Sequence, residues 1–193
     1  MEEVVLLDET GHAVGTADKA TVHHSDTPLH LAFSCYVVNA DDQVLVTRRA
    51  AGKKTWPGAW TNSCCGHPMP GEHVASAARR RLREELGFRE LTLELVLPRF
   101  RYRAVMNNGV VENEMCPVYR ADTTAEPVPD PSEIDAVRWI DWAEFGRAVL
   151  DGSFAVSPWC REQVGELLPL GAVARDWPTA PHDHLPAAAR GER

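Results

Sequence analysis

The segment from Gly66 to Phe88 constrains the fold of this chain more than any other stretch. Five residues separate Gly66 from Glu72, and seven more separate Glu72 from the run RRLREELGF. Apolar residues recur at every fourth position, as on one face of a helix: Val74, Ala78, Leu82 and Leu86. The pattern predicts a helix over residues 72–86, and Gly87 follows where helices commonly end with a left-handed glycine.

The charged residues near the end of this helix allow two interpretations. Arg81 and Glu85 are four positions apart and share a face, with Glu84 beside them. Such a run is typical of a solvated helix face with ion pairs. Carboxylates gathered on one helix could also hold Mg²⁺, which in turn binds phosphate oxygens. The local charges leave both interpretations open.

The complete spacing resembles the Nudix box, which reads Gly-x5-Glu-x7-Arg-Glu-apolar-x-Glu-Glu-x-Gly-apolar. The matching residues are Gly66, Glu72, Arg80, Leu82, Glu84, Glu85, Gly87 and Phe88. The resemblance implies a Nudix fold, in which the carboxylates of this helix carry the metals of pyrophosphate hydrolysis. Arg81 stands where the box has a glutamate. That departure implies weaker cation binding, an added phosphate ligand and a reaction other than ordinary Nudix hydrolysis.

The rest of the sequence predicts antiparallel strands on both sides of this helix and further helices near the end. Two short strands flank the turn DETGH, and strands over 30–38 and 44–48 follow. Residues 91–122 predict a long hairpin around an Asn-Gly turn. A strand over VRWIDW leads to helices over 143–150 and 158–168. This order favours an α+β fold, a mixed β-sheet sandwiched by helices with N-terminal strand and C-terminal helical additions, over a parallel βαβ stack.

A chain of 193 residues is suited to one domain that buries roughly 70% of its unfolded surface. We expect this domain over residues 1–168, with its Nudix core starting at about residue 30. Residues 169–193 have little periodicity and are expected to form a partly mobile tail. Since no heptads or large apolar face stand out, we expect a monomer.

Charge and cysteine content exclude several classes of protein. A formal net charge of -8 lacks the basic footprint that nucleic-acid binding leaves, although a local basic cluster or a bound cation is compatible with a small phosphorylated ligand. The first residues are acidic where a signal peptide is basic. No apolar run reaches the roughly 18 residues of a membrane span. Five cysteines without framework spacing indicate free thiols in a reducing cytoplasm.

The stretch WTNSCCGHP does not identify its own role. Cys64, Cys65 and His67 are compatible with a zinc site, a disulfide, a buried turn or a thiol placed for chemistry. Alternation along a strand would turn the two cysteine side chains to opposite faces. The cysteine pair therefore has to be interpreted with the rest of the chain.

Histidines and carboxylates elsewhere predict a metal site. Glu112 and Glu114 are two positions apart on a predicted strand, so their side chains share a face. Three histidines, His23, His30 and His67, complete the set. Three imidazoles and two carboxylates suit a six-coordinate divalent ion, and Mn²⁺, Mg²⁺ and Zn²⁺ all stay open.

Four segments together resemble one branch of the Nudix family, the type 1 isopentenyl-diphosphate isomerases. They are HHSDTPLHLAFS, LVTRRAAGKKTWPGAWTNSCCGHPMPGE, ENEMCPVY and SPW, and the resemblance runs from about Lys19 to Trp159. It implies an enzyme of isoprenoid synthesis that interconverts isopentenyl and dimethylallyl diphosphate. The segment HHSDTPLH aligns without a gap only if His23, rather than His24, is the matching histidine.

The resemblance also implies residue roles. It makes Cys65 and Glu114 the proton-transfer groups, with Tyr102 as a relay and Trp159 facing the carbocation. The implied ligands of one divalent ion, Mn²⁺, Mg²⁺ or Zn²⁺, are His23, His30, His67, Glu112 and Glu114. A second ion, Mg²⁺ bound with the diphosphate, is implied at Glu85 and the Cys65 backbone. The implied diphosphate contacts are Lys19, Arg49, Lys53 and Arg81.

Two alternatives compete with the isomerase interpretation. A Nudix pyrophosphohydrolase would explain Glu72, Glu84 and Glu85, but it leaves Cys65 and the three histidines without roles. A zinc-stabilised interaction module would need paired Cys-x2-Cys and His-x3–5-His spacings, which this sequence lacks.

Overall fold

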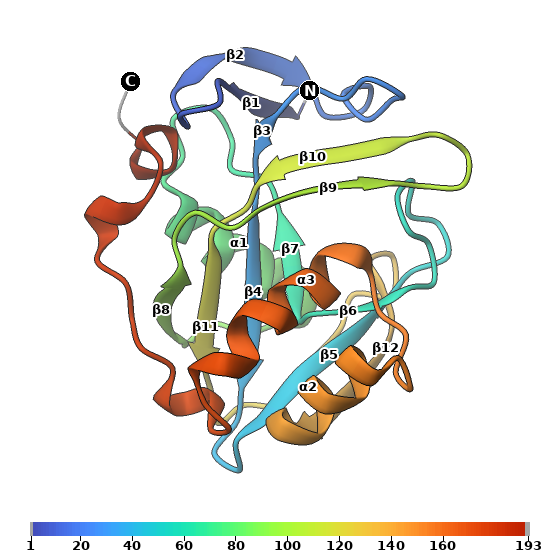
Figure 1. The fold of residues 1–193 in the computed structure, drawn as a ribbon, viewed down its shortest axis with the longest axis vertical. Coiled ribbons are helices and arrows are strands. Elements are labelled where there is room, and N and C mark those ends of the chain that lie inside the picture. The colour runs from blue at the N-terminus through green and yellow to red at the C-terminus, as the bar shows by residue number, and fades with distance from the viewer. Residues whose placement is uncertain (1, 192–193) are drawn as a thin grey trace.

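The structure, a computed structural model, describes residues 2–191 and contains two β-sheets that continue into one another (Figure 1). The five-stranded sheet has the order β2-β1-β3-β10-β9, and the seven-stranded sheet has the order β12-β5-β4-β11-β8 with β6 beside β5 and β7 beside β4. The strands are β1 (Glu3–Leu7), β2 (Ala13–Asp18), β3 (His30–Leu31), β4 (Phe33–Val38), β5 (Gln43–Arg49), β6 (Trp60–Thr61), β7 (Cys64–Gly66), β8 (Thr92–Leu97), β9 (Arg101–Val105), β10 (Val111–Met115), β11 (Val118–Asp122) and β12 (Ile134–Asp141). The helices are α1 (Val74–Leu86), α2 (Trp142–Asp151) and α3 (Pro158–Leu167).

Two predicted strand segments are divided between the sheets. The strand expected over 30–38 breaks at Ala32, so β3 joins the five-stranded sheet and β4 the seven-stranded one. The hairpin expected over 91–122 is also divided, because β9 pairs with β10 in one sheet and β8 pairs with β11 in the other. Pro98 and Pro117 lie at the two crossings, where proline cannot donate a ladder hydrogen bond.

Strand β4 lies between two hydrophobic cores, as a strand covered on both faces requires. All six of its residues are buried. Phe33 and Cys35 pack in a first core with α1, whereas Tyr36 and Val38 pack in a second core with α2 and α3. Figure 1 shows α2 and α3 in front of the seven-stranded sheet and α1 behind it. The predicted α+β fold with a mixed sheet sandwiched by helices is confirmed.

Helix α1 begins at Val74, two residues later than predicted, because His73 caps it. The imidazole of His73 accepts a hydrogen bond from the Ala75 backbone N–H at 3.2 Å. The helix ends as predicted, with Gly87 in the left-handed conformation at φ 74°. No helix within the described residues is both long enough and apolar enough to cross a membrane.

The segment after α3 folds back over both cores in a series of short 3-10 turns. The Asp42 carboxylate accepts hydrogen bonds from the backbone N–H groups of Ala174 and Arg175, both at 3.0 Å. The Arg120 guanidinium donates to the Arg175 carbonyl at 2.6 Å. Trp177 and Leu185 are fully or almost fully buried. The domain limit at residue 168 and the mobility of the tail stay predictions, although this segment supplies buried side chains to the cores.

Candidate active site and metal centre

The register of the five-stranded sheet places three of the predicted site residues in one row. His30 on β3 is paired with Glu114 on β10, and Glu114 is paired with Tyr102 on β9. Side chains directly opposite one another on adjacent strands share a face and lie roughly 5 Å apart. Strand pairing, rather than proximity in the sequence, therefore brings an imidazole, a carboxylate and a phenol together.

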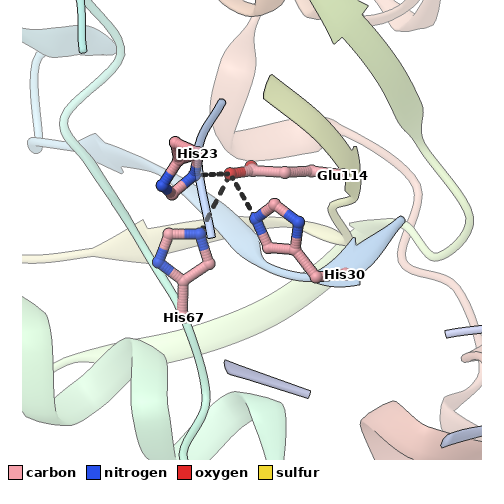
Figure 2. Close-up of side chains that lie close together, drawn as sticks. All are labelled: His23, His30, His67 and Glu114. Carbon is pink, nitrogen blue, oxygen red and sulfur yellow. Dashed lines mark hydrogen bonds and ion pairs between the residues drawn. The ribbon is translucent and has the colours of Figure 1, made fainter. Parts of the chain in front are cut away.

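Three histidines surround the Glu114 carboxylate (Figure 2). The Nε2 atoms of His67, His30 and His23 lie 3.0, 3.4 and 4.0 Å from Glu114 Oε1. One ligating atom from each of these four residues lies within 4.8 Å of the others. The four residues come from separate segments, so the cluster exists only where both sheets meet.

The donor atoms of this cluster fit a divalent cation. His30 Nδ1 donates to the Pro28 carbonyl at 2.9 Å, which leaves the Nε2 lone pair directed at the cluster. The Nε2 atoms of His23 and His30 are buried without a hydrogen-bond partner, a costly arrangement that a metal would relieve. Burial lowers the pKa of His67 to about 4 despite the neighbouring Glu114, so this ring is neutral at pH 7.

Glu112 lies outside the group of four and contacts Tyr102 instead. Tyr102 Oη lies 2.8 Å from Glu112 Oε2 and 2.8 Å from Glu114 Oε2. A phenol has one proton to donate, so one of the two carboxyls must supply the other hydrogen bond. Burial, with the neighbouring Glu114 charge, raises the pKa of Glu112. Glu112 as a metal ligand stays a prediction.

These groups open onto a pocket of about 270 Å³. Its cationic residues are Lys19, Arg49, Lys53, Lys54 and Arg81. The remaining predicted residues on its wall are Cys65, His23, His67, Tyr102, Glu112, Glu114 and Trp159. Two predicted residues do not line it: His30 is fully buried, and Glu85 lines a smaller adjoining cavity. Lys54 was not predicted, although the second lysine of GKK was a visible signal.

The two adjacent cysteines have different surroundings. In the β4–β7 ladder Cys65 is opposite Ser34 and Cys64 is opposite Cys35. Cys64 packs in the first core, and Cys65 lies at the pocket against the second core. Burial raises the pKa of the Cys65 thiol to about 11. All five cysteines of the chain lie in the described residues and are free thiols, so WTNSCCGHP holds no disulfide.

Comparison with known proteins identifies the family. Residues 28–160 match the NUDIX domain. The chain is 59% identical over 189 residues to the isopentenyl-diphosphate Delta-isomerase of Saccharopolyspora erythraea, covering 98% of this chain and 97% of the relative. It is 53% identical over 190 residues to the isopentenyl-diphosphate Delta-isomerase of Rhizobium rhizogenes, covering 98% and 91%. The chain belongs to the isopentenyl-diphosphate Delta-isomerase family of Nudix proteins.

Solved structures share the fold of this isomerase-family chain. A crystal structure of a Deinococcus radiodurans protein superposes with a TM-score of 0.68 at 20% identity, covering 86% of this chain and 98% of that one. The Escherichia coli dihydroneopterin triphosphate pyrophosphohydrolase superposes with a TM-score of 0.55 at 17% identity, covering 73% and 96%. These likenesses, together with the match of residues 28–160 to the NUDIX domain, confirm the predicted Nudix fold.

In this member of the isomerase family, the arginine that departs from the Nudix box is surrounded by acids. Arg81 Nη2 lies 2.5 Å from Glu85 Oε1 and 3.3 Å from Glu133 Oε1. Glu133 also forms an ion pair with Lys53. Burial raises the pKa of Glu85, and Arg81 opposes that effect. The two carboxylates are oxygen donors of the kind Mg²⁺ prefers, which fits the ion implied at Glu85.

The sequence did not predict a role for Glu133, because this residue lies in the acidic loop before β12, among residues that resemble a solvated turn. Its role is visible only when that loop packs beside α1, since its two cationic partners come from the 50–53 turn and from α1. The only local signal was a glutamate directly before a buried isoleucine, Ile134.

Three other Nudix-box positions, Gly66, Glu72 and Arg80, also have close structural neighbours. The Arg80 guanidinium donates to both carboxylate oxygens of Glu72, at 2.9 and 2.8 Å, and to the His67 carbonyl at 3.4 Å. These hydrogen bonds connect the loop that carries His67 to Arg80 on α1, and the bidentate geometry makes the connection specific. A Cβ atom on Gly66 would lie 3.0 Å from the Phe33 ring and 3.1 Å from the Arg81 side chain, so any other residue here would have to displace these side chains by a few tenths of an ångström.

Proposed function

We propose that this chain interconverts isopentenyl diphosphate and dimethylallyl diphosphate, and that Cys65 and Glu114 transfer the protons. The observation that carries the proposal is that one pocket is lined both by a set of cationic side chains and by a set that comprises a thiol, two carboxyl groups and buried aromatic rings. The first suits a diphosphate, and the second suits a short alkene. The names of its relatives, isopentenyl-diphosphate Delta-isomerase, agree with it.

The cationic side chains of the pocket provide charge and geometry for the diphosphate. We assign its contacts to Lys19, Arg49, Lys53 and Arg81. Guanidinium groups bind phosphate oxygens in a bidentate manner, and ammonium groups add point charges. Arg49 is already oriented, because its Nε and Nη2 atoms donate to the Thr55 carbonyl and hydroxyl at 3.0 and 3.2 Å. A chain of net charge -8 thus concentrates cations at one place.

Isomerisation adds a proton to the terminal carbon C4 and removes one from C2, so atoms and electrons balance without an oxidant. One group gives up its proton as the C=C bond is protonated, and the other accepts the proton from C2. Cys65 and Glu114, on the wall of the same pocket, are suited to these two roles. The reverse reaction exchanges the roles, because acid and base are interchanged by microscopic reversibility.

The intermediate would be a tertiary carbocation, which water would trap as an alcohol. The site therefore has to exclude water and stabilise positive charge. Trp159 is almost fully buried, and its ring lies 5.7 Å from that of Tyr102. The Arg49 guanidinium carbon lies 5.6 Å from the Trp159 ring centroid, so this ring already faces a cation. A desolvated cation–π contact contributes about 2 kcal/mol.

The chain's residues provide for two divalent ions in this proposal. His23, His30, His67 and Glu114, with Glu112 as a fifth ligand, would hold Mn²⁺, Mg²⁺ or Zn²⁺, and Glu85 with the Cys65 carbonyl would hold Mg²⁺. When bound, such ions supply positive charge that tunes the carboxyl groups and neutralises the diphosphate. Neighbouring groups of the chain orient the metal ligands, as the Pro28 carbonyl does for the His30 ring.

Pyrophosphate hydrolysis is less well supported by the Nudix-box carboxylates. Glu72 is bound to Arg80, and Glu84 lies 3.2 Å from Arg81 and 3.5 Å from Arg80. Glu72 and Glu84 are thus each paired with an arginine of α1, and Glu85 is the only one of the three carboxylates to which this proposal assigns an ion.

The sequence also leads to expectations about the substrate, oligomeric state, location and partners of this enzyme. The substrate is a small diphosphate, the chain is expected to act as a monomer in the cytoplasm, and no nucleic-acid or membrane partner is expected. The isoprenoid pathway follows from the proposed product.

The deciding experiment incubates the purified chain with isopentenyl diphosphate, Mg²⁺ and Mn²⁺ in D₂O and follows the products by NMR. We expect dimethylallyl diphosphate with deuterium in a methyl group, and deuterium returning to the remaining substrate. Release of inorganic phosphate without dimethylallyl diphosphate would overturn the proposal in favour of hydrolysis.

A further inference from the structure

Asn62 joins two of the groups assigned to the pocket. Its side chain is fully buried. Its amide oxygen Oδ1 accepts hydrogen bonds from Cys65 Sγ and from the Trp159 indole N–H, both at 3.1 Å, and also from the adjacent Thr61 hydroxyl at 2.9 Å. The thiol and the aromatic ring therefore share a single acceptor, although 94 positions separate them in the sequence.

The orientation of this amide is determined by its other contacts. Asn62 Nδ2 lies 3.0 Å from the Cys35 carbonyl and 2.9 Å from the Cys64 carbonyl, and carbonyls only accept. The Trp159 indole N–H only donates. A flipped amide would set oxygen against two carbonyls and NH₂ against a donor, so Oδ1 faces Cys65 and Trp159.

The Cys65 sulfur has a second polar neighbour, the Ser34 hydroxyl. Ser34 Oγ lies 3.3 Å from Cys65 Sγ and accepts a hydrogen bond from Gln163 Nε2 at 2.9 Å. Gln163 Oε1 in turn accepts from the Tyr36 hydroxyl at 3.0 Å. All three of these polar side chains are completely buried. The thiol thus contacts both a fixed amide oxygen and a hydroxyl anchored in the second core.

We propose that Asn62 is a positioning residue that sets the direction of the Cys65 S–H bond and the plane of the Trp159 ring relative to the same substrate. The inference rests on the proposed function, because it concerns the proton donor or acceptor and the ring that faces the cation. The two groups must act on neighbouring carbons of one small ligand. One shared acceptor fixes their relative placement, as preorganisation of a site requires.

The test replaces Asn62 with leucine, which has a similar volume and no hydrogen-bonding groups. We expect kcat to fall about 100-fold, the cost of misplacing a reacting group by roughly 1 Å, with little change in KM. In ¹⁵N-labelled protein, the Trp159 indole resonance, assigned with Trp159→Phe, should move upfield and exchange faster with D₂O. An unchanged kcat or an unchanged indole resonance would overturn the proposal.

Ser63→Ala is the matched control, because Ser63 is the next residue, is equally buried and bonds only to backbone. Its hydroxyl donates to the Leu45 carbonyl at 2.6 Å and accepts from the Val37 N–H at 2.7 Å. We expect Ser63→Ala to lower the melting temperature while kcat and the Trp159 indole resonance stay unchanged. If Ser63→Ala lowered kcat as much as Asn62→Leu, general loosening of this segment would replace the positioning role.

A measurement on the unsubstituted chain keeps the proposal testable if Asn62→Leu does not fold. The Raman S–H stretching band of Cys65 is isolated by difference against Cys65→Ser. We expect this band at the low wavenumber of an S–H group bound to a carbonyl oxygen, and a band typical of a free thiol would refute the proposal. Both spectroscopic measurements are made without substrate, so failure of the isomerase activity would be distinguished from failure of this inference.

Discussion

Cys64 and Cys65 are adjacent in the sequence, yet Cys64 packs beneath α1 in the first core while Cys65 lies at the pocket beside the second. The separation follows from strand alternation on β7, whose residues point to opposite faces in turn. A doublet that looked like a disulfide or a metal pair is one pocket thiol and one packing residue.

This separation predicts opposite outcomes for the two alanine substitutions. Cys65→Ala should abolish isomerisation, because it removes a proton-transfer group. Cys64→Ala should leave turnover nearly intact and lower stability by about 1 kcal/mol for the small cavity it leaves. Turnover assays and thermal melts of both variants check this, and equal losses of turnover would contradict the assignment of proton transfer to Cys65.

Metal binding should depend on one histidine of the pair that begins HHSDTPLH. His23→Gln removes a predicted metal ligand and should lower the affinity for Mn²⁺ or Zn²⁺ by at least about 10- to 100-fold, the loss seen when only a hydrogen-bond partner of a ligand is removed. His24→Gln is the control, since His24 Nδ1 accepts from the Asp26 backbone N–H at 3.1 Å and is not in the ligand cluster. Calorimetric titration of the chelator-treated protein measures both. Equal affinities for His23→Gln and the unsubstituted chain would contradict the assignment.

Arg81 should contribute to diphosphate binding. Arg81→Glu restores the Nudix-box glutamate and places a negative charge at the pocket, so we expect KM for isopentenyl diphosphate to rise about 10-fold or more. Arg83→Glu makes the same charge change on an exposed position of α1 and should leave KM nearly unchanged. Steady-state kinetics compare them. An unchanged KM in Arg81→Glu would remove this residue from the diphosphate site.

The metal-free protein should lose stability in acid through His67. Burial lowers the pKa of His67 to about 4, below its ordinary value near 6.5. The unfolded chain therefore binds this proton first as pH falls, and the free energy of unfolding should decrease from pH 6.5 to pH 4, by about 3 kcal/mol in total. Urea unfolding of the chelator-treated protein across this range measures it, and His67→Gln should flatten the slope. If His67→Gln did not change how the free energy of unfolding depends on pH, other groups would be responsible for the loss of stability.

The segment after α3 should be required for stability even though its sequence resembles a tail. Trp177 is almost fully buried and packs against Trp142 with ring centroids 4.7 Å apart. Trp177→Ala should therefore cost about 3–5 kcal/mol. Val173→Ala, at a position 44% exposed in the same segment, should change stability by less than about 0.5 kcal/mol. Denaturant titrations measure the free energy of unfolding of both variants. A negligible change in Trp177→Ala would support a domain that ends near residue 168.

Local sequence predicted what local physics determines. The end of α1 at Gly87, the Asn-Gly turn between β9 and β10 and the shared face of Glu112 and Glu114 follow from helix capping, turn chemistry and strand alternation. The Nudix spacing and the longer resemblance supplied the pocket residues, because those motifs extend over most of the chain.

Features that depend on contacts between segments far apart in the chain could not be predicted from the sequence. The change of sheet at Ala32 is not encoded by a proline or glycine there, and it depends on the parallel neighbours β10 and β11. Glu133 is an ordinary loop glutamate until Lys53 and Arg81 lie beside it. Asn62 was visible as part of the motif, but its shared acceptor oxygen requires the position of Trp159.

The pairing of His30 with Glu114 has a consequence for how the chain assembles. These two residues are 84 positions apart and lie in a parallel register, so their contact closes a long loop. Long-range parallel pairing forms slowly, because the entropy of loop closure is lost before the contact stabilises the chain. We therefore expect the metal centre to be a late event in folding. In rapid-mixing refolding experiments, the absorbance of bound Co²⁺ would then appear only when β3 and β10 have paired, and not during the earlier hydrophobic collapse of the chain.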